Sequence, residues 1–537
     1  MKNKAKMRWS KVIFLWIGLI FLTSIVAGDS QTSSPSVDIS QLDRYIESAR
    51  QEWKIPGMAV AIVKEDRIVL AKGYGVKEFS KPDKVDEKTL FAIASNTKAF
   101  TAAALGILVD EGKISWDDRV RRYLPYFKLY DPYVTEEMRI RDLICHRSGL
   151  GTFSGDLLWY ETPYSTEEVI RRAQYLKPAF GFRAGYGYSN IMFMAAGEIV
   201  AAVTGMKWKD FVAERIFTPL GMTSTNVGTT DLKKYENVAT PHYVAPDGTT
   251  VTVNYTSSDA IDAAGAINSN AVDMVQWLIL LLNKGSFNGN QILKEESLGE
   301  IWTPHNVLRL SRRTRELFPS THFNTYGLGW GISDYQRYQL IGHSGALDGM
   351  ISRVAVVPEI KLGLVILTNS MNSLPTALVY KIIDTFLGVE PKDWSQVYLE
   401  LYRKSLLEET PQSEKLRAPG KRKEKKELVP KVNLEEYAGV YTDIMYGDAK
   451  VYIEKDKLVL EFLPAPVFIS DLSSKQMDIF HLQLRNFFSF IPRGTGTVQF
   501  LRNMDGQVVT MKIDIPNNDF FFTELEFVKR PADRSRN

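Results

Sequence analysis

The chain has very few of the residues that cross-link proteins or bind metals. Its 537 residues include one cysteine, Cys145, and six histidines. A single cysteine excludes an internal disulfide and a zinc cluster built on cysteines. No two histidines have the His-x-x-x-His spacing of a helical zinc site, which disfavours a metal enzyme. Cys145 lies in the apolar run DLICH, so we expect a buried structural thiol.

The chain also lacks a large excess of charge of either sign. Charged residues make up 24% of the chain and the formal net charge is only +3, so nucleic acid is not expected as a partner. There is no internal repeat. No Gly-x-Ser-x-Gly motif surrounds a candidate serine, which argues against an α/β-hydrolase. Hydrophobic residues account for 45% of the chain, enough for a large core and more than one domain.

The N-terminal segment, residues 1–28, differs from the rest. MKNKAKMRWSK is basic and lacks acids, and VIFLWIGLIFLTSIVAG is apolar and ends in small residues. This order is typical of a secretory signal peptide, and the run is nearly long enough to serve as an uncleaved membrane anchor. No cysteine lies near the cleavage region, so a lipoprotein site is not expected. We therefore expect a secreted, periplasmic or cell-surface protein.

Residues 38–388 have the pattern of an α/β (α+β) domain. A helix is predicted from Ile39 to Trp53, and GMAVAIVKEDRIVLAKGYG predicts two strands joined at Glu65 to Arg67. Residues 95–300 are mostly helical with long loops. YQLIGHSG, MISRVAVVP and LGLVILTN then predict strands, and TALVYKIIDTFLG a closing helix. Strands at both ends predict one sheet assembled from both ends of the segment, with a helical region inserted.

A second domain is predicted after a linker. Residues 389–430 include KLRAPGKRKEKKELVPK, which is charged and flanked by proline, so we interpret this stretch as a solvated linker. Residues 431–537 are rich in strand patterns, and Asp505-Gly506 between two of them is a strong hairpin signal. This predicts a small β-barrel or sandwich.

The best candidate for a nucleophile lies in FAIASNTKAFTAAAL, residues 91–105. Ser95 and Lys98 form the one Ser-x-x-Lys of the chain, at the start of an apolar helix. Three residues along a helix place Lys98 on the same face as Ser95. A buried lysine has a lowered pKa and can act as a neutral base for a serine nucleophile. The alternative is that Ser95 only caps the helix.

Two further segments supply the remaining parts of an acyl-transfer site. Tyr188 and Asn190, in GFRAGYGYSN, offer a phenol as a base, with its ionisation eased by a cationic Lys98, and an amide for a substrate carbonyl or for Lys98. Tyr235 and Asn237 have the same spacing but lie in the charged stretch DLKKYENVAT, with no packed element after them, so Tyr188 is favoured.

The third segment, IGHSGALDG, follows a predicted strand. His343 would face a cleft from this strand, with Gly345 in the turn beside it. The backbone N–H of Ala346 could pair with that of Ser95 as an oxyanion hole. On its own, His343 would be interpreted as an ordinary turn histidine. It becomes a candidate site residue because it lies in the third motif.

Together these motifs resemble the serine β-lactamase and penicillin-binding-protein family, in its class C-like branch. Ser95-Asn96-Thr97-Lys98 matches the nucleophile motif, Tyr188-Ser189-Asn190 the tyrosine motif, and His343-Ser344-Gly345 stands where many members have Lys-Thr-Gly. Secondary matches are IRDLICHRSGLG, DAAGAINSNAVDM and YGLGWG. The resemblance covers about residues 40–388 and implies that Ser95, Lys98 and Tyr188 are catalytic. The C-terminal residues resemble the lipocalin-like domain of some secreted peptidases of this family.

The resemblance implies an exported serine hydrolase that forms an acyl-enzyme on Ser95 and needs no cofactor or metal. The substrate would be a small molecule or a short peptide, with D-amino-acid peptides as the first expectation. Histidine at position 343 carries a weaker, pH-dependent charge than lysine, which disfavours β-lactam resistance as the main role. A carboxylesterase, a weak β-lactamase and a non-catalytic penicillin-binding sensor remain alternatives. Homo-oligomerisation, membrane anchoring and a binding role for the C-terminal domain stay open.

Overall fold

The computed structural model describes residues 37–245, 248–390, 392–404 and 432–531. The predicted signal or anchor at residues 1–28 lies outside the described residues, as does most of the predicted linker.

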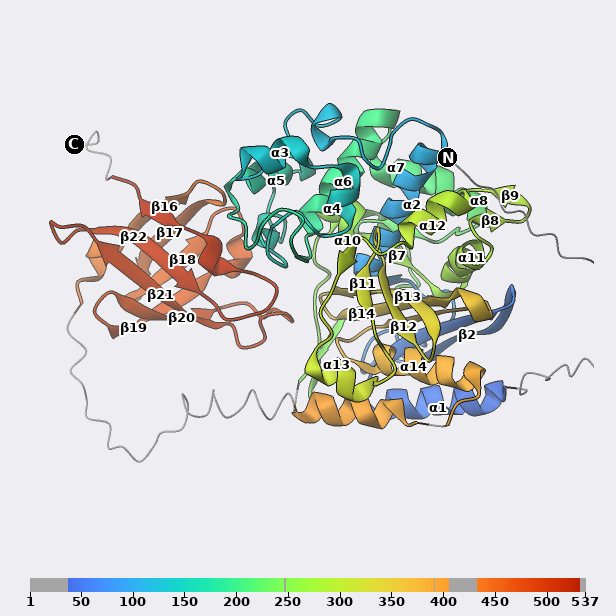
Figure 1. Cartoon of the computed structure of the whole chain (residues 1–537). Helices are drawn as coiled ribbons and strands as arrows, with labels where there is room; N and C mark the ends of the chain where they lie inside the picture. Colours follow the sequence, from blue (N-terminus) through green and yellow to red (C-terminus); the bar gives the residue numbers. More distant parts are fainter. Residues whose placement is uncertain (1–36, 246–247, 391, 405–431, 532–537) are drawn as a thin grey trace, which may run out of the picture. The chain divides into compact units, whose positions relative to one another are not determined.

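An eight-stranded antiparallel sheet forms the frame of the first domain (Figure 1). The strand order is β10-β11-β12-β13-β14-β15-β1-β2. The bounds are β1 Gly57–Lys64, β2 Arg67–Gly75, β10 Asn306–Val307, β11 Asn324–Tyr326, β12 Gly331–Tyr335, β13 Tyr338–Leu347, β14 Met350–Val357 and β15 Leu362–Thr368. Because β1 pairs with β15, the sheet is assembled from both ends of the domain, as predicted.

The predicted first hairpin is present. Glu65 and Asp66, between β1 and β2, have φ of 52° and 63°. Two successive residues in the left-handed region give a tight turn whose twist matches that of the flanking strands.

Two helices cover one face of the sheet. α1, Ile39–Glu52, begins after Asp38, whose carboxylate accepts the Gln41 N–H at 3.0 Å. α14, Leu374–Leu387, lies beside α1 (Figure 1) and ends at Gly388, whose φ of 64° suits a glycine. The apolar sides of both helices pack with the outward-facing residues of β1, β14 and β15 in one core cluster.

The helical region covers the other face. α2 (Thr97–Asp110), α6 (Asn190–Thr204) and α11 (Ala271–Leu282) are its longest helices. α2 is buried from Thr97 through Leu108, as expected for a helix that is apolar on all sides. The shorter helices are α3 Pro132–Glu137, α4 Ile140–Ile144, α5 Thr166–Arg172, α7 Trp208–Val212, α8 Thr218–Leu220, α9 Thr229–Leu232, α10 Asp262–Gly265, α12 Glu295–Ile301 and α13 Arg312–Leu317.

Short strands complete the helical region. A three-stranded sheet is formed by β3 (Phe91–Ala92), β7 (Ile267–Ser269) and β4 (Asn226–Val227). Its strand β3 ends shortly before Ser95 in the chain. Two two-stranded sheets are formed by β5 His242–Val244 with β6 Thr250–Thr252, and by β8 Ser286–Phe287 with β9 Asn290–Gln291.

The C-terminal domain is a closed eight-stranded antiparallel barrel, which confirms the predicted small barrel. Its strands are β16 Gly439–Asp443, β17 Gly447–Glu454, β18 Lys457–Phe462, β19 Ser470–Gln476, β20 Ile479–Leu484, β21 Thr495–Arg502, β22 Val508–Asp514 and β23 Phe527–Lys529. The predicted Asp505-Gly506 hairpin joins β21 to β22. β16 pairs with β23, so closure leaves no unpaired edge strand in the barrel.

The first domain extends past the predicted boundary at residue 388. Residues 394–404 are helical rather than part of a linker. Trp394 and Leu399 are almost fully buried in the same core cluster as α1 and α14. The charged composition of the following residues concealed this short apolar segment. Residues 405–431 of the predicted linker lie outside the described residues.

Among the described residues, no single helix is long and apolar enough to cross a membrane. The pair Asn190–Thr204 and Trp208–Leu220 reaches the required length and composition only together, across a 76° bend.

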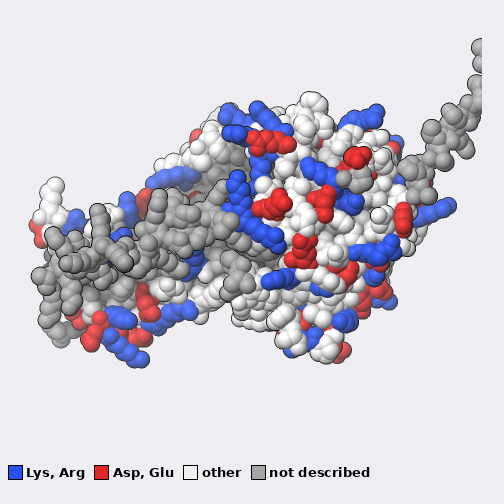
Figure 2. Space-filling view, turned by 90° about the horizontal axis from the view of Figure 1, so that it is seen from below, with Lys and Arg blue, Asp and Glu red and all other residues white. Residues whose placement is uncertain are grey.

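The outer surface carries charges of both signs. On the face in Figure 2, Lys and Arg are interspersed with Asp and Glu over the described residues.

Candidate active site

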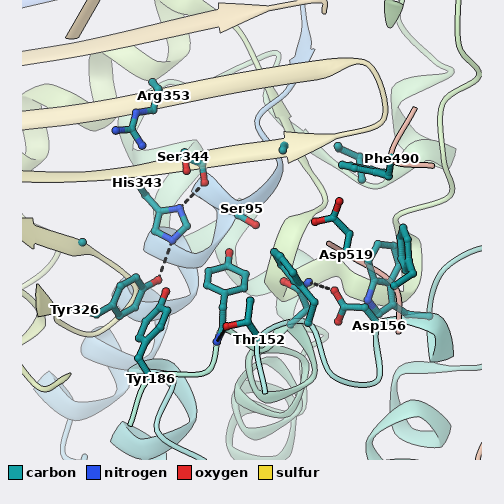
Figure 3. A pocket seen from close by; sticks show the side chains of 18 of the residues that line it. Ser95, Thr152, Asp156, Tyr186, Tyr326, His343, Ser344, Arg353, Phe490 and Asp519 are labelled. Carbon is teal, nitrogen blue, oxygen red and sulfur yellow. Dashed lines mark hydrogen bonds between the residues drawn. The ribbon is translucent and has the colours of Figure 1, made fainter. Parts of the chain in front are cut away.

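Ser95 lies at a strained turn between β3 and α2. It occupies the 3₁₀ turn η1, Ala94–Asn96, which leads directly into α2. Ala94 has φ of 47°, an unfavourable value for alanine that is typical of backbone strain at functional sites. The turn presents Ser95 to a cavity of about 450 Å³ (Figure 3). Ser95 is therefore more than a helix cap.

Lys98 is positioned to activate Ser95. It is completely buried, and its Nζ lies 3.1 Å from Ser95 Oγ. The same Nζ donates to Asn190 Oδ1 at 2.7 Å and to the Ala264 carbonyl at 2.8 Å. Burial lowers the pKa of Lys98 to about 7, against a smaller opposite effect of the Asp156 carboxylate. A substantial neutral fraction is thus present at neutral pH, as a lysine base requires.

Asn190 is the first residue of α6, and its amide group is hydrogen-bonded to Lys98 and Asp156. Its amide oxygen faces Lys98, while its Nδ2 donates to Asp156 Oδ2 at 2.6 Å. Asp156 is almost fully buried. Burial raises the pKa of Asp156 to about 7. Because Oδ2 of Asp156 accepts from the amide nitrogen and Lys98 can only donate, the amide oxygen of Asn190 faces Lys98. Of the two roles offered by the sequence, the structure supports the contact with Lys98.

Tyr188 precedes α6 and lines the cavity beside Ser95. Its ring centroid is 4.7 Å from Lys98 Nζ. Burial raises the pKa of Tyr188 well above its ordinary value, and the Ser95 hydroxyl opposes this only in part. The expectation of an easier ionisation of this phenol is therefore wrong in direction, because burial disfavours the phenolate. Tyr188 is a protonated phenol at neutral pH, suited to pass a proton on.

His343 is neutral and saturated with hydrogen bonds. Its Nδ1 lies 2.6 Å from the Ser344 carbonyl and must carry the proton, because a carbonyl only accepts. Its Nε2 therefore accepts the Tyr326 hydroxyl at 2.8 Å. Burial, with a further effect of Lys98, lowers the pKa of His343 to about 3. The predicted pH-dependent positive charge is thus absent near neutral pH, because the imidazole has lost its contact with water.

Gly345 and Ala346 bring β13 against the nucleophile. A Cβ on Gly345 would lie 2.0 Å from the Ile93 carbonyl oxygen and 2.9 Å from the Ser95 nitrogen. Only a glycine allows β13 to pass so close to η1. Ala346 follows and lines the cavity with Ser95, which is the arrangement expected of an oxyanion hole built from their two N–H groups.

The competing Tyr-x-Asn pair lies elsewhere. Tyr235 is 38% exposed and does not line the cavity. Asn237 bonds to Thr89 and Asp86 near β3. Tyr188 and Asn190, by contrast, line the cavity together with Ser95.

Sequence reasoning missed several residues of the site. His146, in the quoted segment IRDLICHRSGLG, accepts the Ser189 N–H through Nδ1 at 3.1 Å, and its ring lies 4.3 Å from that of Tyr188. Tyr326, in YGLGWG, donates a hydrogen bond from its hydroxyl to His343 Nε2. Asp156 had no motif to mark it.

The barrel also contributes to the cavity. Phe490, Asp519 and Phe520 line it together with the first-domain residues (Figure 3). No sequence signal linked these positions, more than 390 residues from Ser95, to the site. The barrel therefore helps to shape the cavity around the nucleophile.

Over residues 37–245, 248–390, 392–404 and 432–531, no group of three histidine, cysteine, aspartate or glutamate side chains could hold a metal ion. Cys145 is fully buried and free, as predicted.

Comparison with known families identifies both domains. Residues 42–382 match the Beta-lactamase family, and residues 423–529 match a domain of unknown function, DUF3471. Unguisins hydrolase ungD' from Aspergillus campestris is 30% identical over 375 residues, which cover 67% of this chain and 68% of that protein.

Solved structures share the fold. The octameric penicillin-binding protein homologue from Pyrococcus abyssi is similar with a TM-score of 0.60 and 20% identity, over 92% of this chain and 100% of that chain. The D-amino acid amidase from Ochrobactrum anthropi SV3 has a TM-score of 0.51 and 25% identity, over 65% of this chain and 98% of that chain. With its Ser95 site intact, this chain belongs to the beta-lactamase and penicillin-binding-protein family of serine hydrolases.

Proposed function

We propose that this protein is a peptidase or amidase that hydrolyses short peptides, including D-amino-acid peptides, through an acyl-enzyme on Ser95. The observation that carries the proposal is the fully buried Lys98, with a pKa of about 7 and its Nζ 3.1 Å from Ser95 Oγ. The likeness to a hydrolase and to a D-amino acid amidase supports amide substrates.

In the acylation step, neutral Lys98 takes the proton of Ser95 as Oγ bonds to the substrate carbonyl carbon. The carbonyl electron pair moves to the oxygen, which the N–H groups of Ser95 and Ala346 stabilise. When the C–N bond breaks, Tyr188 gives its proton to the leaving nitrogen and regains one from Lys98. The phenol is suited to this role because its raised pKa keeps it protonated.

Deacylation runs the same relay in reverse. Tyr188 accepts a proton from water and passes its own to Lys98 as the water oxygen attacks the acyl carbon. Collapse of the intermediate breaks the bond to Ser95 Oγ, and Lys98 returns the proton to the serine. The enzyme ends in its starting protonation state.

The alternatives use the same residues. A carboxylesterase would differ only in its leaving group. A β-lactamase role is disfavoured because His343 is neutral and both its ring nitrogens are occupied, so it offers no charge to a penicillin carboxylate. A sensor would stop at the acyl-enzyme.

The test compares hydrolysis of a D-alanyl nitroanilide and a short-chain nitrophenyl ester by the wild type, Ser95→Ala and Ser473→Ala. Ser473 is an exposed barrel residue and serves as the matched control. We expect Ser95→Ala to lose both activities by at least about 1,000-fold, because the covalent route is removed. Ser473→Ala should behave like the wild type.

Retention of wild-type activity by Ser95→Ala would refute the assignment. Cleavage of the ester alone would favour the esterase. No turnover, together with an acyl adduct on Ser95 detected by mass spectrometry, would favour the sensor. Action outside the cytoplasm is part of the same proposal and rests on the basic and apolar pattern of residues 1–28.

A further inference from the structure

His146 receives a backbone N–H group from the residue on each side of Tyr188. The Gly187 N–H donates to the His146 carbonyl at 3.0 Å, and the Ser189 N–H donates to His146 Nδ1 at 3.1 Å. The imidazole also packs against the phenol, with the two ring centroids 4.3 Å apart and the planes tilted by 33°. One residue therefore restrains both the backbone around Tyr188 and its ring.

His146 lies behind the cavity wall. It is fully buried and does not line the cavity, whereas Tyr188 does. The ring centroids of Tyr186, Phe193 and Tyr326 lie 5.5, 5.2 and 4.7 Å from that of His146. The ring of Tyr188 is nearer than any of these three, so an effect of His146 on the reaction passes mainly through Tyr188.

The hydrogen bond from Ser189 requires a neutral imidazole. A backbone N–H only donates, so Nδ1 of His146 must be unprotonated and the proton is on Nε2. Burial, followed by the effects of Lys98 and His343, lowers the pKa of His146 well below its ordinary value. The exclusion of water thus keeps Nδ1 available as an acceptor near neutral pH.

His146 carries two energetic costs that a residue kept only for packing would not need. Its φ of 59° lies in the left-handed region, which is unfavourable for residues other than glycine. Its Nε2 is buried and has no hydrogen-bond partner among the described residues. Costs of this kind concentrate at functional sites, so they favour a role in the reaction over a purely structural one.

We propose that His146 is a positioning residue, which holds the hydroxyl of Tyr188 where it protonates the leaving group. This inference deepens the proposed function and rests on its acyl-enzyme route. As the bond from the acyl carbon to the leaving atom breaks, that atom takes the phenol proton, and this transfer depends on the placement of the ring. Attack by Ser95 depends less on His146, because the hydrogen bond between Lys98 and Ser95 does not involve it.

The test uses leaving groups that differ in their need for a proton. The substrates are a nitrophenyl ester and an ethyl ester of the same acid, and a D-alanyl nitroanilide. Nitrophenolate leaves without a proton, whereas ethoxide and the anilide nitrogen must be protonated. The measured quantity is the second-order rate constant for acylation of Ser95, taken as kcat/KM or, without turnover, from acyl-enzyme formation followed by mass spectrometry. The esters make the test valid for a peptidase and for an esterase.

The variants separate the acceptor from the fold. His146→Leu removes the acceptor, whereas His146→Asn keeps one near the position of Nδ1 and tolerates the positive φ. His146→Gln, which has no polar atom at the Nδ1 position, tests the same loss if the leucine variant does not fold. His242→Leu is the matched control. His242 is also fully buried and accepts a backbone N–H, but its partners are Phe79 and Asn369. Thermal melts identify the folded variants.

We expect His146→Leu to lower the rate constants for the ethyl ester and the anilide by about 100-fold, and that for the nitrophenyl ester by less than about fivefold. His146→Asn should recover at least about tenfold of the larger loss. His242→Leu should keep the wild-type ratios between substrates, even if it is less stable.

Equal losses for all three substrates, no loss, no recovery in His146→Asn, or the same change of ratio in His242→Leu would overturn this inference alone. A wild type that forms no acyl-enzyme with any of the substrates would overturn the proposed function as well. The two failures are therefore distinguishable.

Discussion

At the residue scale, catalysis depends on how burial redistributes protons among neighbouring groups. Burial brings Lys98 to a pKa of about 7, lowers the pKa of His343 to about 3 and raises that of Tyr188. In each case the charged form is disfavoured because water is excluded. Near neutral pH the site therefore holds a neutral imidazole, a neutral phenol and a partly neutral amine around Ser95.

This protonation pattern predicts the pH dependence of the reaction. Below about pH 7, Lys98 is protonated and cannot accept the Ser95 proton, so kcat/KM should rise as pH increases through that region. The Asp156 carboxylate raises the pKa of Lys98. Burial raises the pKa of Asp156 itself to about 7, so its charge is present mainly in the upper part of this range. Asp156→Asn removes that charge and should move the acid limb to lower pH. The measurement is the pH profile of kcat/KM from pH 5 to 9.

His343→Gln is the control for this profile. With a pKa of about 3, His343 does not titrate within the measured range, so its replacement should change the height of the profile more than the position of the limb. If the limb disappears in His343→Gln and does not move in Asp156→Asn, the titrating group is His343 and not Lys98.

At the element scale, the site depends on the approach of β13 to η1. Gly345 lets the strand pass the backbone of Ile93 and Ser95, and Ser352 on β14 reinforces the contact by donating to the Ile93 carbonyl at 2.6 Å. The oxyanion hole therefore depends on the packing of two elements far apart in sequence.

Gly345→Ala should separate these elements. Its Cβ would lie 2.0 Å from the Ile93 carbonyl oxygen, so the backbone must shift. We expect a loss of about 1–3 kcal/mol in the free energy of unfolding and a fall of at least about 100-fold in kcat, because the oxyanion donors move apart. Denaturant melts and ester kinetics measure the two effects.

Gly299→Ala is the matched control, because a Cβ at this position in α12 meets no atom within 4 Å. It should leave kcat unchanged. Wild-type kcat in Gly345→Ala would show that the close approach does not form the oxyanion hole.

At the scale of the whole molecule, the barrel is bonded to the elements that carry the site. Glu524 accepts from Ser154 Oγ at 2.5 Å and from the Gly155 N–H at 2.9 Å, next to Asp156. Ser489 donates to Asp348 at 2.5 Å. Asp348 lies in the turn between β13 and β14, two residues after Ala346. The barrel thus restrains both walls of the cavity.

Ser489→Ala should weaken this restraint. Asp348 is buried and would lose one of its three side-chain donors, the others being Tyr160 and Thr256. We expect a loss of about 1–2 kcal/mol in the free energy of unfolding and a lower kcat, since the turn after Ala346 becomes looser. Chemical denaturation and ester kinetics test this, with Ser473→Ala as the exposed control. Unchanged kcat despite the lost stability would limit the barrel to a structural role.

The sequence alone determined the local features of this protein. The central hairpins, α1, α14 and the barrel hairpin at Asp505-Gly506 follow from alternating or helical apolar patterns and turn residues, which act over a few positions. Ser95 and Lys98 could be paired because three residues along a helix bring side chains together.

Only the tertiary structure decided how the distant parts act on one another. The sequence located Tyr188, Asn190 and His343, but their protonation and contacts depend on burial by elements from the whole chain. Asp156 and Asp519 had no motif at all, because a lone acid acquires a role only from the cavity around it. The order of the motifs thus predicts the chemistry of the family. The protonation states of the groups around Ser95 depend on long-range packing, because this packing excludes water from them.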